Sequence, residues 1–462
     1  MKTKLRAILI LSALLVNFFL FAQKEDSLTI RKIYENALLC DTGYNNLYYL
    51  TKKIGPRLAG TPQSLAAVDW AYHAMKNLGC DTAYLQETTV ARWIRGDVEI
   101  CNITSTKFGE LKTKVCALGG SVGTPKGGIL ADVIEVKTFD ELKTLGEKNI
   151  KGKIVFFNRA MDPTEINPFY AYGKAVDQRG HGAKEAAKYG AVGVIIRTLS
   201  LTNNDFPHTG VLRYDEKIVK IPAAAISTND AEILSKWLKQ DSALKMFFEM
   251  YCKYDGEAKS YNVIGEIKGS EKPNEIITVG GHLDSWDITP GANDDGAGCI
   301  HSMDVIRIFK SLKIKPKHTI RTVLFMDEEL NQRGGGTYAE TVKKENEKMI
   351  VALESDEGGA MPIGFSVDAN SEIVEAVKQW EPLLKPYGLY EFSKGWGGVD
   401  IDPLKKQGIP LIGLTINAQR YFEYHHAQND TFETVNKREL QMGGAAFASL
   451  IYLIDKYDFE KK

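Results

Sequence analysis

From about residue 260 onward, short apolar runs alternate with amphipathic segments, and this alternation limits the possible folds more than any other feature. The apolar runs predict strands at 276–281, 320–326, 350–353 and 410–414. The amphipathic segments predict helices at about 296–312, 335–346, 371–380 and 437–457. Repetition of strand, loop and helix is typical of an α/β sandwich with a largely parallel sheet. We therefore predict an α/β fold, a three-layer sandwich with a mixed, largely parallel sheet.

The part of the chain before residue 260 shows two different patterns of predicted helices and strands. Residues 24–114 mix helical patterns with short strands, and we assign them to the same domain as residues 255–462. Between 115 and 250, glycine pairs separate several strand candidates from two short helices. This pattern is typical of a small domain with its own sheet. We therefore predict that 115–250 is a compact domain inserted into the larger one.

The first residues have the pattern of a secretory signal peptide. Lys2, Lys4 and Arg6 precede an apolar run from 7 to 22, and polar residues follow directly. The run is short for a membrane span, which needs about 20 apolar residues. We predict a signal peptide over 1–22, export to the periplasm or beyond, and no permanent membrane span after cleavage. An uncleaved membrane anchor is the alternative.

The composition argues against a nucleic-acid partner and against two common types of cysteine site. The 58 Lys and Arg residues balance 59 Asp and Glu residues, so the formal net charge is −1. A chain without a basic excess lacks the general attraction that binds nucleic acid, and we expect no nucleic-acid partner. The six cysteines form no C-x-x-C pair, which argues against a zinc ribbon or a thioredoxin-type site. Their disulfide pairing stays open.

Five candidate metal ligands follow predicted strands or lie in loops of the C-terminal part. They are His282, Asp294, the Glu328-Glu329 pair, Asp356, and His426 in the pair His425-His426. Ligands of open α/β sheets gather outside the carboxyl ends of the strands, so these side chains are expected to meet. Histidine with carboxylate and no cysteine favours zinc, with cobalt or manganese as substitutes.

Two metal ions about 3.5–4 Å apart can act together on one water, and a shared carboxylate is the natural way to hold that spacing. Asp294 stands next to Asp295 at the start of a predicted helix, in a position suited to this bridge. The alternative for any one of these carboxylates is a helix cap or a solvated charge. Their joint occurrence at strand ends favours the metal site. The other histidines are interpreted as structural or surface residues: His73, His181, His208, His301 and His318.

The order His, Asp-Asp, Glu-Glu, Asp, His resembles the two-zinc peptidase family that includes bacterial leucyl aminopeptidases, glutamate carboxypeptidase and the transferrin receptor. The matching motifs are Ile54 to Gly60, Gly281 to Asp287, Gly291 to Gly296, Asp327-Glu328-Glu329, Glu354-Ser355-Asp356, and His425-His426 through Thr431. The middle region, including 182–188 and 207–210, is similar to the protease-associated domain inserted in this family. The resemblance covers nearly the whole chain after the predicted signal peptide, and 283–287 is its most specific stretch.

The resemblance implies a role for each ligand. Asp294 bridges the two metals. His282 and Asp356 complete one metal site, and Glu329 and His426 complete the other. The resemblance therefore implies two Zn²⁺ ions per chain.

The resemblance also implies two residues that act beside the metals. Glu328 is the general base, and Asp284 is the partner that orients His282. Of the adjacent pair His425 and His426, the second is chosen because the family's ligand stands four residues before an acidic residue, here Asp430.

The function implied is an exported exopeptidase that hydrolyses short peptides, of the carboxypeptidase or dipeptidase type. An aminopeptidase with the same two metals is the nearest alternative. A receptor-like binding protein is less favoured, because such a protein is expected to lose ligands or the base, and all are present here. The stretches 357–359 and 395–398 match no known substrate pocket, so the preferred side chain stays open. The sequence also leaves open whether the protein forms a homodimer. The inserted domain could either form a dimer contact or cover the site.

Overall fold

Two eight-stranded sheets organise the computed structural model, which describes residues 24–459. The strands of the first sheet are β1 (Thr82–Ile94), β10 (Lys253–Ile267), β11 (Lys272–His282), β12 (His318–Phe325), β13 (Lys348–Glu354), β14 (Pro362–Asp368), β15 (Glu391–Lys394) and β16 (Leu411–Ile416). Their order across the sheet is β1-β10-β12-β11-β13-β16-β14-β15. The predicted signal peptide, 1–22, lies outside the described residues. None of the described helices is long and apolar enough to cross a membrane.

The centre of the first sheet is parallel and its flanks are mixed. Strand β11 pairs in parallel with both β12 and β13, and β13 pairs in parallel with β16. β10 and β14 add antiparallel pairings. Every residue of β12 is buried, as expected for a parallel strand covered on both faces. The predicted strands at 276–281 and 320–326 are thus confirmed, and the sheet is mixed as expected.

Helices cover the two faces of the first sheet. A helix over residues 24–38 is followed by α2 (Thr42–Tyr49), α3 (Pro62–Asn77), α8 (Ala297–Ser311), α9 (Arg333–Lys344), α10 (Ser371–Lys378), α11 (Glu381–Leu384), α12 (Tyr421–Tyr424) and α13 (Lys437–Tyr457). Helices α2, α3, α8 and α13 share one hydrophobic cluster on one face. Helix α9 and the turn at 402–407 form a separate hydrophobic cluster on the other face of the sheet. Helices α8 and α13 confirm the predictions at 296–312 and 437–457.

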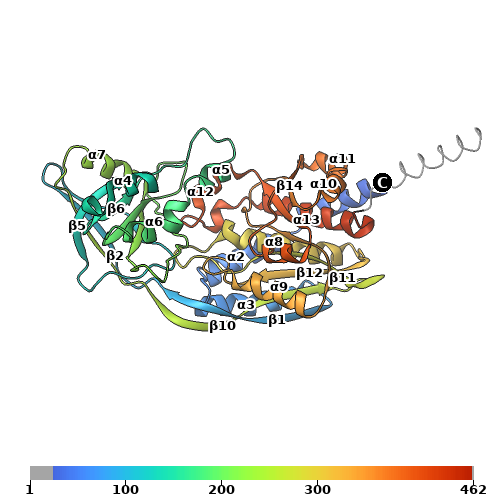
Figure 1. Cartoon of the computed structure of the whole chain (residues 1–462). Helices are drawn as coiled ribbons and strands as arrows, with labels where there is room; N and C mark the ends of the chain where they lie inside the picture. The colour runs from blue at the N-terminus through green and yellow to red at the C-terminus, as the bar shows by residue number, and fades with distance from the viewer. Residues whose placement is uncertain (1–23, 460–462) are drawn as a thin grey trace, which may run out of the picture.

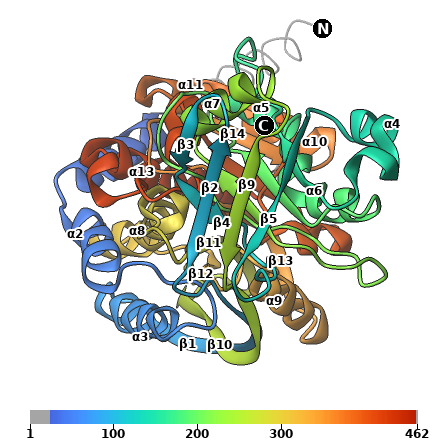
Figure 2. The ribbon, with the colours of Figure 1, turned by 90° about the vertical axis from the view of Figure 1, so that its left-hand side faces the viewer.

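The second sheet forms the opposite end of the molecule (Figure 1). Its strands are β2 (Glu99–Ser105), β3 (Gly109–Lys112), β4 (Val115–Ala117), β5 (Ile129–Val136), β6 (Ile154–Phe157), β7 (Gly193–Arg197), β8 (Ala223–Ile226) and β9 (Lys245–Met250). Figure 2 shows β2, β9 and β5 side by side. The helices of this part are α4 (Phe139–Ile150), α5 (Pro168–Gly173), α6 (Asp177–Ala187) and α7 (Thr228–Leu238).

Strand β2 pairs with β9 and belongs to the second sheet, so this sheet begins 16 residues before the boundary predicted at residue 115. Alternation of apolar and polar residues identified a strand near 98–103 but does not say which sheet it joins. The long strands β1 and β10 run together along the lower side of the molecule and lead the chain into and out of the second sheet (Figure 1).

The loop that follows β11 connects the part of the molecule built on the first sheet to the part built on the second sheet. Trp286 in this loop is fully buried within the hydrophobic core of the second sheet. A Cβ atom on Gly119 would lie 1.8 Å from the Trp286 ring, so only glycine allows this contact. The Arg95 guanidinium also binds both carboxylate oxygens of Asp287, at 2.7 and 2.9 Å. The second sheet is therefore positioned directly against the residues that follow His282.

Replacing Gly119 is expected to destabilise the protein because the new methyl group must displace Trp286. We expect Gly119→Ala to lower the free energy of unfolding by about 1–3 kcal/mol, the usual effect of overpacking a dense core. Gly180→Ala, in α6, is the matched control, since no atom lies within 4 Å of its added Cβ. Urea unfolding of both variants measures the difference, and equal stabilities would contradict the tight contact.

Candidate metal centre

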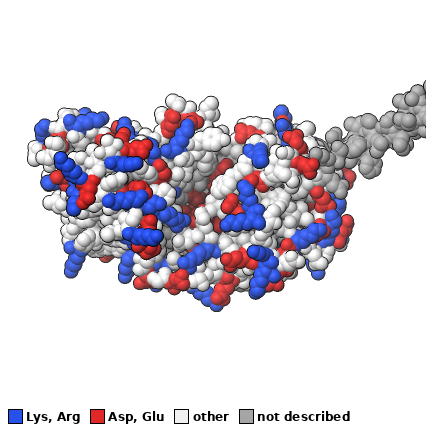
Figure 3. Space-filling model, in the orientation of Figure 1, with Lys and Arg blue, Asp and Glu red and all other residues white. Residues whose placement is uncertain are grey.

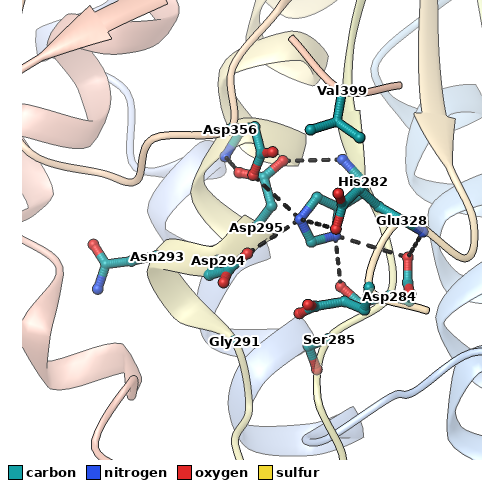
Figure 4. Close-up of polar contacts among 12 residues, drawn as sticks. His282, Asp284, Ser285, Gly291, Asn293, Asp294, Asp295, Glu328, Asp356 and Val399 are labelled. Carbon is teal, nitrogen blue, oxygen red and sulfur yellow. Dashed lines mark hydrogen bonds and ion pairs between the residues drawn. The ribbon is translucent and has the colours of Figure 1, made fainter. Parts of the chain in front are cut away.

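The carboxyl ends of the central strands bring the predicted ligands to one edge of the first sheet, and Figure 4 shows three of them, His282, Asp294 and Asp356. His282 ends β11, Glu329 follows β12 and Asp356 follows β13. Asp294 lies in a short helical turn, Ala292–Gly296, before α8, and His426 follows α12. The five side chains come from five separate segments, and all five meet in one buried cluster.

The first half of the cluster centres on His282, which is 1% exposed. Its Nε2 atom lies 3.1 Å from Asp294 Oδ1 and 3.2 Å from Asp356 Oδ1. Its Nδ1 atom lies 3.1 Å from the main-chain carbonyl oxygen of Asp284. A carbonyl only accepts hydrogen bonds, so Nδ1 carries a proton. Burial lowers the pKa of His282, but the charges of Asp356 and Asp294 outweigh it and raise that pKa well above its usual value, so a cation bound at Nε2 would replace a proton there.

The second half of the cluster centres on His426. Its Nε2 atom lies 3.3 Å from Asp294 Oδ2 and 3.2 Å from Glu329 Oε2. Nε2 of His425 is 4.0 Å from Asp294 Oδ2, and its ring stacks on that of His426 at 3.6 Å. Asp294 thus directs one oxygen to His282 and the other to His426. This is the arrangement expected of a carboxylate shared between two sites.

The residues present fit divalent cations. Asp294 and Glu329 are 5% and 3% exposed, and Asp294 Oδ2 and Glu329 Oε1 have no hydrogen-bond partner. Burial, with the nearby carboxylate of Asp294, raises the pKa of Glu329 well above its usual value. Burial lowers the pKa of His426 to about 3, so its imidazole is neutral, the form that binds metal. Buried carboxylates without cations are costly, and imidazole with carboxylate oxygen is a donor set that zinc accepts.

Asp284 contacts His282 at hydrogen-bond distance through its main-chain carbonyl, and its carboxylate lies farther from the ring. Its Oδ1 atom lies 3.7 Å from His282 Nδ1, and the carbonyl of the same residue makes the contact instead. The carboxylate accepts hydrogen bonds from the main-chain N–H groups of Asp327 and Glu328, at 2.9 and 3.2 Å. Asp284 therefore connects the loop after β11 to the Glu-Glu turn after β12.

The consecutive glutamates occupy different positions, as predicted. Glu329 contacts His426 and its side chain is 1% exposed. The Glu328 carboxylate lies 4.0 Å from Nε2 of His282, and its side chain is 14% exposed. Burial and the surrounding carboxylates raise the pKa of Glu328 well above its usual value. Figure 3 shows acidic atoms deep in the hollow between the two halves of the molecule.

Two acidic residues hold the loop that carries Asp294. The Asp430 carboxylate accepts hydrogen bonds from the main-chain N–H groups of Asn293 and Asp294, at 2.8 and 3.0 Å. The Asp295 carboxylate accepts one from the main-chain N–H of His282, at 3.0 Å. The sequence used Asp430 only as a marker of spacing, and the structure gives it a positioning role.

The second sheet supplies cluster neighbours that the sequence did not identify. Arg179, in α6, is 8% exposed; its Nη1 lies 3.3 Å from His426 Nδ1, and its Nε has no partner. The guanidinium lies over the ring of Tyr172, 5.4 Å from its centre. The ring of Tyr172 also meets that of His425 edge-on at 5.3 Å.

Of the two interpretations left open for His208, structural or surface, the structure agrees with the first. His208 is 2% exposed, neither ring nitrogen has a hydrogen-bond partner, and burial with the nearby charge of Arg179 lowers its pKa to about 3. The following residue, Thr209, donates its main-chain N–H to the carbonyl of His426 at 3.0 Å. No signal in the sequence showed that this stretch of the middle region reaches the metal cluster.

The chain is similar to known peptidases along most of its length. Residues 262–451 match the family model described as peptidase family M28. The chain is 32% identical to carboxypeptidase Q of Mus musculus over 415 residues, which cover 90% of this chain and 86% of that protein. The crystal structure of a peptidase M28 precursor from Shewanella amazonensis is 34% identical, with a TM-score of 0.89, and the match covers 95% of this chain and 98% of that one.

A more distant structure agrees with the fold. The zinc aminopeptidase of Bacillus subtilis is 23% identical, with a TM-score of 0.63, over 89% of this chain and 94% of that chain. The mixed α/β architecture is therefore that of known zinc exopeptidases. Given this fold and the near full-length match to carboxypeptidase Q, the chain belongs to peptidase family M28.

Proposed function

We propose that this chain is an exported two-zinc exopeptidase that hydrolyses short peptides with free ends. The observation that carries the proposal is the position of Asp294, whose two carboxylate oxygens face His282 and His426 separately. Asp356 and Glu329 complete the two donor sets. Two Zn²⁺ ions held there would lower the pKa of a water molecule and polarise the peptide carbonyl.

Glu328 is the residue placed to move protons. It adjoins the His282 half of the cluster and is more exposed than Glu329. It takes a proton from the attacking water and returns it to the leaving amine. Asp284 holds the main chain of Glu328 and thereby fixes the position of this base.

Arg179 favours a substrate with a free carboxylate. When Nε2 of His426 faces a metal, Nδ1 of the same ring carries the proton and no longer accepts a hydrogen bond from Arg179. The buried guanidinium then lacks an acceptor there, and its Nε already has none. A peptide carboxylate matches the planar fork of arginine. This supports the carboxypeptidase or dipeptidase function over an aminopeptidase that reads only the free amine.

Three further parts of the proposal concern export, the second sheet and the oligomeric state. Export rests on the predicted signal peptide, 1–22. The second sheet is proposed to be an inserted domain of the protease-associated type, and the contact of its Arg179 with His426 favours a covering role. The cluster is complete within one chain, so the proposal does not depend on a homodimer.

Zinc content and a blocked-peptide panel test the proposed function. We expect about two zinc ions per chain by elemental analysis of the zinc-loaded protein. We expect an unblocked dipeptide to be cleaved faster than its N-acetyl or C-amide form, because each block removes a terminal charge. One zinc ion or none would contradict the two-metal proposal. Efficient cleavage inside long proteins would contradict the exopeptidase proposal.

A further inference from the structure

One predicted ligand, His426, is in direct contact with a segment of the second half of the molecule, residues 208–211. The main-chain N–H of Thr209 donates a hydrogen bond to the carbonyl of His426 at 3.0 Å. A Cβ atom on Gly210 would lie 2.6 Å from Nδ1 of the His426 ring, so the main chain of the segment passes close to that ring. The segment 208–211 therefore contacts both the main chain and the side chain of this ligand.

The main chain of His426 has a conformation that needs support. Its φ is +62°, in the left-handed region that residues with a side chain rarely adopt. Such a conformation persists where the surroundings hold it in place. The hydrogen bond from Thr209 to the His426 carbonyl is a contact that does so. The direction in which the His426 ring points thus depends on the position of the segment 208–211.

The second sheet fixes the position of this segment. The Thr209 hydroxyl donates a hydrogen bond to the carbonyl of Ala117, which ends β4, at 2.8 Å. The main-chain N–H of Gly119 donates one to the carbonyl of Gly210 at 3.0 Å. Both partners of the segment belong to the second half of the molecule. A displacement of the second sheet would therefore also displace the group that holds His426.

The contacts that dock the second sheet involve the same residues. Arg95 binds the Ala117 carbonyl and the Asp287 carboxylate, at 2.7 Å in each case. Trp286, buried in the core of the second sheet, meets the ring of His426 edge-on, with ring centres 5.6 Å apart. Docking of the second sheet and placement of His426 are thus set by one connected group of contacts.

The other end of the cluster is held by the first sheet and its own loops. His282 ends β11, and its main-chain N–H donates a hydrogen bond to the Asp295 carboxylate at 3.0 Å. Its Nδ1 contacts the carbonyl of Asp284 at 3.1 Å. All of these groups belong to the first half of the molecule. The two halves of the cluster therefore depend on the second sheet to different degrees.

We propose that the segment 208–211 is a positioning element for His426, so that the metal site at this end reaches its full affinity only when the second sheet is docked. The second sheet then contributes to metal binding as well as covering the cluster. This inference rests on the two-metal part of the proposed function, and it concerns one of the two sites.

Zinc titration calorimetry of metal-free Gly210→Ala tests the inference. The added methyl group must displace either the segment or the His426 ring, and the φ of +124° at this position disfavours alanine. We expect one zinc affinity to fall by about tenfold to a hundredfold, the usual effect of losing a group that holds a metal ligand. The other affinity should not change. Gly152→Ala is the matched control: its φ is also positive, +77°, but no atom lies within 4 Å of its added Cβ.

A double variant identifies which site is affected. Glu329 contacts His426, so Gly210→Ala combined with Glu329→Gln should still retain one tight site, because both changes act at the same end. Unchanged affinities in Gly210→Ala, or loss of both sites in the double variant, would overturn the inference alone. Fewer than two zinc ions bound to the unaltered protein would contradict the proposed function and this inference with it.

Hydrogen exchange of the unaltered protein gives a readout that does not depend on a variant folding. If docking of the segment strengthens zinc binding, zinc must equally favour docking of the segment. With zinc we expect peptides that cover 205–212 to exchange more slowly. Peptides from α7, at the far end of the same half, should change little (Figure 1). Equal exchange of 205–212 with and without zinc would reject the inference.

Discussion

Glu328→Gln is expected to bind two zinc ions and fold normally, yet to lower kcat by at least about 10²–10⁴-fold, the range for loss of a general base. The substitution keeps the size and hydrogen bonding of the side chain and removes its ability to take a proton. Glu328 does not contact His426, and its main chain is fixed by the Asp284 carboxylate, which the substitution leaves in place. Metal content and the position of the loop should therefore be unchanged. Steady-state kinetics and elemental analysis of the same preparation measure both expectations.

Glu329→Gln is the matched control, one residue along the same turn. Its carboxylate lies 3.2 Å from Nε2 of His426, so its loss should weaken the metal site at that end. We expect this variant to lose zinc to a chelator at a lower concentration than the unaltered protein, and to regain turnover with excess zinc. Near-normal turnover of Glu328→Gln, or loss of zinc from it, would mean that the two glutamates have been assigned the wrong roles.

The predicted cluster was accessible to sequence analysis because of one geometric rule. The carboxyl ends of parallel strands meet at the same edge of a sheet, so polar residues directly after apolar runs come together. His282, Glu329 and Asp356 each follow a run of this kind, and the structure places all three in one cluster. The strands themselves were recognisable because a parallel strand buried on both faces is apolar along its whole length.

The residues that the second sheet places near the metal cluster could not be predicted by this rule. Arg179 and His208 lie far from His426 in sequence, and their positions depend on how two sheets pack. That packing is set by contacts such as Gly119 against Trp286, which no local pattern reveals. Gly210 shows the same limit: a Cβ atom there would lie 2.6 Å from Nδ1 of His426, so a glycine in the middle region is required for close approach to the metal cluster.

Asp284 shows why a predicted partner can have a different contact. The resemblance implied that Asp284 orients His282, without saying which of its atoms does so, and the main-chain carbonyl makes the contact at hydrogen-bond distance. Its carboxylate instead binds two main-chain N–H groups across the site. The choice between a carbonyl and a carboxylate depends on side-chain rotamers, which the pattern of residue types does not specify.

Asp294→Asn is expected to abolish binding of both zinc ions at concentrations that saturate the unaltered protein, and turnover should fall at least as far as in Glu328→Gln. The reason is that each oxygen of Asp294 serves a different half of the cluster. Replacing one oxygen by an NH₂ group puts a donor where a ligand is needed. The remaining carboxylate contacts, from Asp356 and Glu329, are then divided between two incomplete sites.

Thermal unfolding with and without zinc separates this effect from simple misfolding. A ligand that binds only the folded state raises its stability by RT ln(1 + [L]/Kd), so zinc should raise the Tm of the unaltered protein and not that of Asp294→Asn. Without zinc, the variant should still unfold cooperatively but at a somewhat lower Tm, because the contact with His282 outweighs burial and lowers the pKa of Asp294, so its charged form stabilises the fold at neutral pH. A variant that retains two zinc ions and cleaves dipeptides would show that Asp294 is not the bridge, whereas a zinc-free variant that fails to fold would show that this carboxylate stabilises the loop itself.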